Sequence, residues 1–296
     1  MIPAGRMSTR GGGFRRAEGL GFDDRRRKGC GTASRRDCSA RAASAIVRAV
    51  RPPPLPHQLA VLRDVLDRVT RAATDGARTP VVVFDLDATL YDNRPRTLRI
   101  LEEYAAEVRA EFPDVAASLA TLEASHIHYL LSDTLRGCGL THPELVKDVT
   151  AYWRDRFFTD EYCRYDVPLD GARDYVHACH AAGAVVVYMT GRDVPGMFLG
   201  TVASLRDSGF PIGIAGTECV LKPDATLPDE AFKRTALPSL LRIGDVLAFF
   251  DNEPANCNVA LQVFPHALSV VLDTQRVPGA PPPDAGVETI SDFRLD

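Results

Sequence analysis

Two aspartates, Asp85 and Asp87, follow the apolar run 81–84 and have types and spacing suited to chemistry. Alternate residues of an extended chain point to the same side, so the two carboxylates should lie close together. Close carboxylates repel, so they share a proton or flank a cation. A hard cation such as Mg²⁺ takes oxygen ligands and usually arrives with phosphate, leaving one aspartate as nucleophile and the other as acid and base. The alternative is a strand that simply ends in a solvated turn.

The run 81–84 reads VVVF and predicts a fully buried strand, because four apolar residues, three of them β-branched, precede the aspartates. In a parallel α/β sheet, ligands collect at the carboxyl ends of the strands. We therefore expect chemistry where this strand ends.

A second apolar strand is predicted by the run 184–189, which ends in Thr190 and Gly191. Asp193 and Pro195 then open a helix. A phosphate placed there would receive the Thr190 hydroxyl, the Gly191 amide and the helix N-terminus. The alternative is an ordinary turn from strand to helix.

A third apolar run, 246–250, meets Asp251, Asn252 and Glu253 before Pro254 begins a helix. The alternative is that Asp251 or Asn252 only caps this helix.

The stretch 81–92 resembles the first motif of the haloacid dehalogenase-like (HAD) superfamily, an Asp-x-Asp-x-Thr after an apolar strand, matched by Asp85, Asp87 and Thr89. The runs that end at Thr190 and Asp251 are similar to the second and fourth motifs, in family order. This resemblance covers residues 79–273. It implies the α/β class, with a Rossmann-like core whose parallel sheet carries helices on both faces.

The third motif of the superfamily is a single basic residue, which offsets the charge between nucleophile and phosphate. Lys233 is preferred because it leads into the last motif, and Lys222 stays open. For the metal, the resemblance implies Mg²⁺ held by Asp85, the backbone carbonyl of Asp87, and Asp251. Asn252 stands where the commonest form has a second acid, which leaves the roles of Asn252 and Glu253 open, with Asn256 as a further candidate to assist.

The second aspartate decides which chemistry the resemblance implies, because dehalogenases of the superfamily lack it and phosphatases and phosphomutases keep it. We expect Mg²⁺-dependent hydrolysis of a small phosphorylated metabolite. Asp85 would attack phosphorus to form an aspartyl-phosphate, and Asp87 would protonate the leaving oxygen and then activate water. Thr190, Gly191 and Lys233 would bind the phosphate. A sugar phosphomutase and a catalytically silent binding module remain as alternatives.

Residues 94–168 carry helical periodicity and no convincing strand, so we predict a small α-helical cap domain inserted after the first motif. The core would comprise residues 52–93 and 169–296. In the superfamily, an insertion here is a type 1 cap, which closes over the active site, excludes water and selects small substrates.

Charge is uneven along the 296 residues, whose net charge is −4. Residues 1–51 contain 13 Lys and Arg and 4 Asp and Glu, a net +9, and we expect a disordered basic extension that need not belong to the native protein. It lacks interleaved aromatics, so we expect no nucleic-acid partner. No apolar run could span a membrane, and seven scattered cysteines indicate thiols in a reducing cytoplasm. Substrate identity and oligomeric state are not encoded in any motif.

Overall fold

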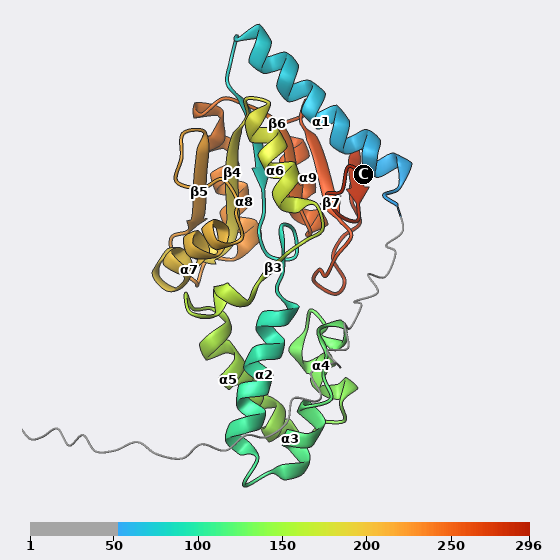
Figure 1. Ribbon diagram of the computed structural model, residues 1–296, viewed down its shortest axis with the longest axis vertical. Coiled ribbons are helices and arrows are strands. Elements are labelled where there is room, and N and C mark those ends of the chain that lie inside the picture. Colours follow the sequence, from blue (N-terminus) through green and yellow to red (C-terminus); the bar gives the residue numbers. More distant parts are fainter. Residues whose placement is uncertain (1–52) are drawn as a thin grey trace, which may run out of the picture. The chain divides into compact units, whose positions relative to one another are not determined.

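The computed structural model describes residues 53–296 (Figure 1), all of them within the unit Arg51–Asp296. The basic segment 1–51 expected to be disordered lies outside the described residues. No helix of residues 53–296 has the length and apolar character needed to cross a membrane.

Six strands form one sheet in the order β5-β4-β1-β6-β7-β8, and every neighbouring pair is parallel. The strands are β1 (Pro80–Phe84), β4 (Val185–Asp193), β5 (Thr217–Lys222), β6 (Asp245–Asp251), β7 (Leu268–Leu272) and β8 (Val287–Ile290). The predicted α/β class with a parallel sheet is thereby confirmed. Because the chain adds strands to one side of β1 and then to the other, the order reverses between β1 and β6, where ligands bind in such sheets.

Helices cover both faces of this sheet (Figure 1). They are α1 (Pro56–Asp75), α6 (Ala172–Ala181), α7 (Val194–Asp207), α8 (Asp229–Ala236) and α9 (Pro254–Val263), with the short helix η3 (Leu237–Arg242). Alternate residues of β1 enter different cores: Val82 and Phe84 pack with α1 and α6, whereas Val81 and Val83 pack with α8 and α9. This alternation makes β1 fully buried and fixes which side each residue after it faces.

A helical insert follows the first strand and has an apolar core of its own, which includes Leu101, Leu135 and Val149. Its elements are α2 (Arg94–Val108), α3 (Pro113–Leu119), η1 (Ala124–His126), α4 (Leu131–Gly137), α5 (Pro143–Phe157) and η2 (Tyr162–Tyr165). A two-stranded antiparallel ribbon, β2 (Tyr91–Asp92) with β3 (Val167–Pro168), joins it to the core. The sequence showed no strand here, since two residues are too few for a periodic signal.

Some local expectations were wrong. Helical periodicity over 116–135 predicts one helix, but the helix is interrupted after Leu119, because Glu123 and His126 bond each other's backbone and start η1 instead. The sequence of 141–144 predicts a capping box, but helix α5 begins at Pro143 with His142 as N-cap and has no side-chain cap bond.

Two further expectations near the end of the core were also wrong. The sequence predicts Asp170 as the N-cap of helix α6, but Gly171, with φ of 74°, takes this place. Residues 287–290 carry no strong strand pattern and were expected to form a loose closing segment, but they form β8 because they pair in parallel with β7, the preceding strand, and bury Ile290.

Candidate active site

Three charged side chains meet at the reversal of strand order between β1 and β6. Asp85 follows β1 and Asp251 ends β6, and the Asp85 amide donates to the carbonyl of Phe250 at 2.9 Å. Helix α8 supplies Lys233, whose Nζ lies 2.7 Å from Asp85 Oδ1 and 2.6 Å from Asp251 Oδ2. No side chain of the three is more than 5% exposed. One ammonium therefore bridges two buried carboxylates.

Burial governs the protonation of this cluster. It raises the pKa of Asp85 to about 7, an effect that Lys233 opposes and the charges of Asp251 and Asp87 reinforce. For Lys233, burial alone would lower the pKa, but Asp251 and Asp85 outweigh it and hold the pKa above its usual value. Lys233 is thus a fixed cation, and the negative charges of Asp251 and Asp87 disfavour the ionised form of Asp85.

Hydroxyl and amide groups orient the two carboxylates. Thr89 Oγ1 donates to Asp85 Oδ2 at 3.0 Å and lies 3.4 Å from Asn252 Oδ1. Asn256 Nδ2 lies 3.1 Å from both oxygens of Asp251. Of the residues left open around the metal, Asn256 therefore holds Asp251, Asn252 faces Thr89, and the Glu253 side chain accepts from the amide of Val277.

The turn after β1 depends on Ala88, which has a φ of 57°. This left-handed conformation costs a residue with a Cβ about 1–2 kcal/mol. Side chains fix both of its peptide groups: its amide donates to Asn93 Oδ1 at 3.2 Å, and its carbonyl accepts from Thr274 Oγ1 at 2.5 Å. The turn returns the chain towards the ribbon and leaves Asp87 facing the insert.

Asp87 lies in an ion-pair network with two arginines. Arg192 forms two bonds with it, from Nε to Oδ2 at 2.9 Å and from Nη2 to Oδ1 at 2.8 Å. Arg96 Nη2 adds one at 3.3 Å, and Asn93 Nδ2 donates to Oδ1. Burial would raise the pKa of Asp87, but Arg192 and then Arg96 outweigh it and hold that pKa well below its usual range. Asp87 is therefore a carboxylate in this arrangement.

Asp166 holds both arginines from the opposite side. Arg96 Nε donates to its Oδ1 at 2.8 Å, Arg96 Nη2 also contacts its Oδ2, and Arg192 Nη2 donates to Oδ2 at 2.7 Å. The side chains of Asp166 and Arg96 are fully buried, and that of Arg192 is 1% exposed. The sequence analysis did not identify Arg96 or Asp166, because a charged residue is normally expected at the surface.

Thr190 and Gly191, expected to bind phosphate, lie near the end of β4, the neighbour of β1. Thr190 is fully buried, and its hydroxyl accepts from the Arg192 amide at 3.3 Å, a bond that does not use the hydroxyl proton. The adjoining α7 N-terminus is already capped, because the Asp193 carboxylate accepts from the Gly196 amide at 2.9 Å. One amide of this terminus is therefore already used, and phosphate binding by its other groups stays a prediction.

The two candidate lysines have different partners. Lys233 contacts Asp85, whereas Lys222 Nζ lies 2.7 Å from Oδ1 of Asp229, a side chain that is 60% exposed. The other oxygen of Asp229 lies against Gly191, where an added Cβ would come within 2.2 Å of it. Lys222 and Asp229 thus form an ion pair beside the expected phosphate site, at a partly exposed edge of the candidate active site that we call the rim.

The insert contributes Tyr129 to this rim. Burial raises the pKa of Tyr129 to about 12, and the charges of Glu253, Asp229, Asp87 and Asp85 add to the effect, so the phenol lies within electrostatic reach of the acidic groups of the site. The same loop is tied to the core, since Gln275 Nε2 donates to the Ile127 carbonyl at 2.5 Å and the Gln275 carbonyl accepts from Asn252 Nδ2 at 2.7 Å.

The oxygens expected to hold a divalent cation are paired with Lys233 in this structure. Asp85 Oδ1 and Asp251 Oδ2 both contact Lys233 Nζ, and the backbone carbonyl of Asp87 follows in the chain. The Asp87 side chain is held by arginines, and residues 53–296 include no group of three or more His, Cys, Asp or Glu side chains that could hold a metal. Two carboxylates, one carbonyl and oxygens from outside the protein suit Mg²⁺, which is usually held in this way.

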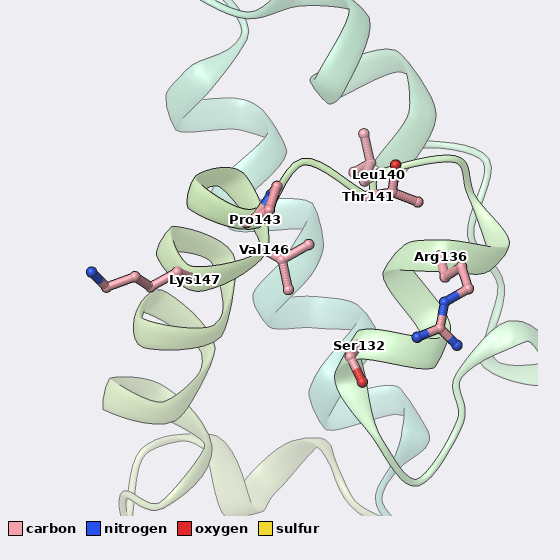
Figure 2. A pocket seen from close by; sticks show the side chains of 7 residues that line it. All are labelled: Ser132, Arg136, Leu140, Thr141, Pro143, Val146 and Lys147. Atoms are coloured by element: carbon pink, nitrogen blue, oxygen red, sulfur yellow. The ribbon is translucent and has the colours of Figure 1, made fainter.

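Two hollows lie on other parts of the described surface. One, of about 360 Å³, lies between α4 and α5 of the insert, and Figure 2 shows its seven lining residues. The side chain of Lys147 points away from the others, and Arg136 is paired with Asp133 at 2.8 Å. The second is lined by residues 155–156, 159–162 and 196. Neither hollow includes a residue of the constellation around Asp85.

Comparison with family models and with curated proteins finds no match. Solved structures do match. A HAD-superfamily hydrolase, subfamily IA, variant 1, from Geobacter sulfurreducens is 14% identical with a TM-score of 0.45, over 73% of this chain and 93% of that chain. The protein tyrosine kinase A of Mycobacterium tuberculosis is 17% identical with a TM-score of 0.45, over 73% and 95%. A predicted phosphatase from Clostridium acetobutylicum is 18% identical with a TM-score of 0.41, over 66% of this chain and 84% of that chain. The chain is similar in fold to these proteins, among others. Its own residues carry the argument about its chemistry.

Proposed function

We propose that this chain is a phosphohydrolase that transfers the phosphoryl group of a small phosphate monoester to Asp85 and then to water. One observation carries the proposal: a carboxylate at the end of the central strand, Asp85, is bridged by the buried Lys233 to Asp251. A nucleophile beside a fixed cation, at the point where ligands collect in parallel sheets, suits attack on an anionic phosphate.

In the first half of the reaction, an oxygen of Asp85 attacks phosphorus and the ester oxygen leaves. Asp87 lies two residues further along and, once it has taken up a proton from solvent, would pass that proton to the leaving oxygen. Lys233 offsets charge on the phosphoryl oxygens, and the Thr190 hydroxyl would donate to one of them. In the second half, Asp87 takes a proton from water, the water attacks the phosphoryl group, and Asp85 is released.

The arginines beside Asp87 bias the two halves differently. Arg192 and Arg96 favour the ionised carboxylate, which suits the second half, in which Asp87 accepts a proton. The first half would then proceed best with leaving oxygens that need little protonation, such as those of aryl esters. We expect aryl phosphates to be better substrates than alkyl phosphates.

We further propose Mg²⁺ as the cofactor, held by Asp85, the backbone carbonyl of Asp87, and Asp251. When bound, it would polarise the phosphoryl group and offset its charge. The support is that one cation, the Lys233 ammonium, already contacts an oxygen of Asp85 and an oxygen of Asp251, so both carboxylates lie within reach of a shared positive charge.

The insert is proposed to act as a cap that excludes water and selects the leaving group. Its support is the loop that carries Tyr129, which Gln275 ties to the core through Ile127 and whose phenol lies near the acidic groups of the site. Water exclusion would strengthen the electrostatic interactions inside.

The test is phosphate release from a panel of phosphate monoesters by the full chain, with Mg²⁺ and with EDTA. We expect release that requires Mg²⁺ in the wild type and at least a 10²-fold loss in Asp85→Asn, since covalent catalysis depends on this carboxylate. Full activity of Asp85→Asn, or no phosphate from any ester, contradicts the proposal. If phosphate reappears on another hydroxyl of the substrate, the chain is a mutase.

A further inference from the structure

We infer that Arg192 is a positioning residue that fixes the orientation of the Asp87 carboxylate for proton transfer. The inference rests on the proposed phosphohydrolase reaction and adds a residue to it. Arg192 follows Thr190 and Gly191, so its position in the sequence allows either a phosphate contact or a solvated side chain. It is neither solvated nor free to bind phosphate, because its guanidinium is occupied by Asp87, Asp166 and Thr201.

The contact between Arg192 and Asp87 is bidentate. Nε meets Oδ2 at 2.9 Å and Nη2 meets Oδ1 at 2.8 Å, so both oxygens of the carboxylate are fixed in one plane. A planar guanidinium holds a carboxylate in this way, whereas the ammonium of lysine acts as a point charge and fixes no plane. The role inferred for Arg192 therefore depends on its shape as well as its charge.

The two oxygens of Asp87 are held unequally. Oδ1 receives Asn93 Nδ2, Arg96 Nη2 and Arg192 Nη2, whereas the contact to Oδ2 comes from Arg192 Nε. The Asp87 side chain is 33% exposed. Oδ1 is therefore the anchored oxygen, and Oδ2 is the one with a lone pair left for a proton exchanged with substrate or water.

Arg192 is itself held firmly from the opposite side. Asp166 Oδ2 accepts from its Nη2 at 2.7 Å, and Thr201 Oγ1 on α7 accepts from its Nη1 at 3.3 Å. Asp166 also binds Arg96 of the insert. The segment that leads out of the insert thus contacts Arg192 directly, and the first helix of the insert is linked to Arg192 through Asp166.

The test compares Arg192→Lys with wild type on two substrates, p-nitrophenyl phosphate and glycerol 2-phosphate. The rate constant kcat/KM reports the step in which the leaving group departs. An alkoxide needs a well-placed proton from Asp87, and a nitrophenolate does not. We expect kcat/KM for glycerol 2-phosphate to fall about 10–100-fold and that for p-nitrophenyl phosphate to fall less than about 3-fold, since misplacement of a reacting group by 1 Å costs about 10²-fold.

Coupling to Asp87 is tested by a double mutant. In an Asp87→Asn background, Arg192→Lys should cause no further loss on either substrate, because the group it orients is gone. Arg206→Lys, at an arginine that is paired with Asp207 and exposed, serves as the matched control for the substitution itself. If Arg192→Lys does not fold, Thr201→Val removes one anchor of Arg192 and should lower kcat/KM for glycerol 2-phosphate by a few fold.

Equal losses on both substrates, or a loss that persists in the Asp87→Asn background, overturn the inference and leave the proposed function in place. Unchanged kinetics of the folded Arg192→Lys protein do the same. If the wild type hydrolyses neither ester nor any other monoester, the proposed function itself has failed.

Discussion

Lys233→Met tests the bridge on which the site is built, because it replaces a buried cation by an apolar side chain of similar length. Asp85 and Asp251 would then face each other as buried carboxylates without their common partner. Breaking a buried ion pair by removing one partner costs about 3–5 kcal/mol, mainly because the other charge stays buried. Here two carboxylates lose the same partner, so we expect a loss at the upper end of this range in the free energy of unfolding.

The loss should depend on pH. The folded-state pKa of Asp85 is already raised from 3.8 to about 7, and without Lys233 it rises further. A carboxyl whose folded pKa is raised costs stability as pH increases between its unfolded and folded values. In the wild type, the loss of free energy of unfolding caused by ionising Asp85 stops growing near pH 7. In the variant, the folded-state pKa of Asp85 is higher, so this loss continues to grow above pH 7. The difference between the two proteins should therefore grow above pH 7, by up to about 1.4 kcal/mol per pH unit.

The assay is urea unfolding of the full chain in EDTA at pH 6 and pH 8, so that no divalent cation replaces the lysine. Lys222→Met is the matched control, since its partner Asp229 is 60% exposed and stays hydrated when the lysine is lost, whereas Asp85 and Asp251 stay buried. We expect a smaller loss for Lys222→Met than for Lys233→Met. Lys233→Met with Asp251→Asn removes one of the two stranded charges and should recover part of the lost stability without restoring activity.

The reasoning is refuted if Lys233→Met unfolds within about 1 kcal/mol of wild type at both pH values, a difference typical of surface substitutions. It is also refuted if adding Asp251→Asn lowers stability further. Either result would mean that Lys233 does not compensate these carboxylates in solution.

Three other substitutions probe the remaining features. Asp166→Ala removes the fully buried partner that two buried guanidiniums share and leaves them Asp87 alone, so it should cost about 3 kcal/mol in urea unfolding, whereas Glu161→Ala, at an exposed pair, should stay within about 0.5 kcal/mol. Ala88→Gly relieves a positive φ and should leave the free energy of unfolding unchanged or raise it by up to about 1 kcal/mol. As a control, Ala106→Gly on the exposed face of α2 should lower it by about 1 kcal/mol. A loss at Ala88 as large as that at Ala106 would contradict the conclusion that the turn at Ala88 is strained. Tyr129→Ala should raise KM several-fold for the best monoester and change kcat less. Unchanged steady-state kinetics would show that Tyr129 does not contact the substrate.

The strand ends could be predicted because their signal is local. Apolar runs before Asp85, Thr190 and Asp251 each gave a buried strand, and parallel strands end at one edge of a sheet. The structure brings Asp85 and Asp251 together for that reason. The segment 287–290 gave no such signal, since its place in the sheet comes from pairing with β7.

Local patterns did not identify the charged partners, and Lys233 was preferred over Lys222 only through the resemblance to the superfamily. Lys233 is 148 residues from Asp85 in the sequence, and its approach depends on where α8 packs on the sheet. Arg192 is buried because Asp87 and Asp166 compensate its charge, and these come from segments that meet only in the folded chain.

The sequence by itself determined that two carboxylates follow a buried central strand and that a second strand ends in another acid. It could do so because strand formation and side-chain alternation depend on neighbouring residues. Only the tertiary structure decided that Lys233 faces Asp85 and that arginines hold Asp87. The physical reason is that a buried charge is stable only beside a partner, and folding brings those partners together from distant parts of the chain.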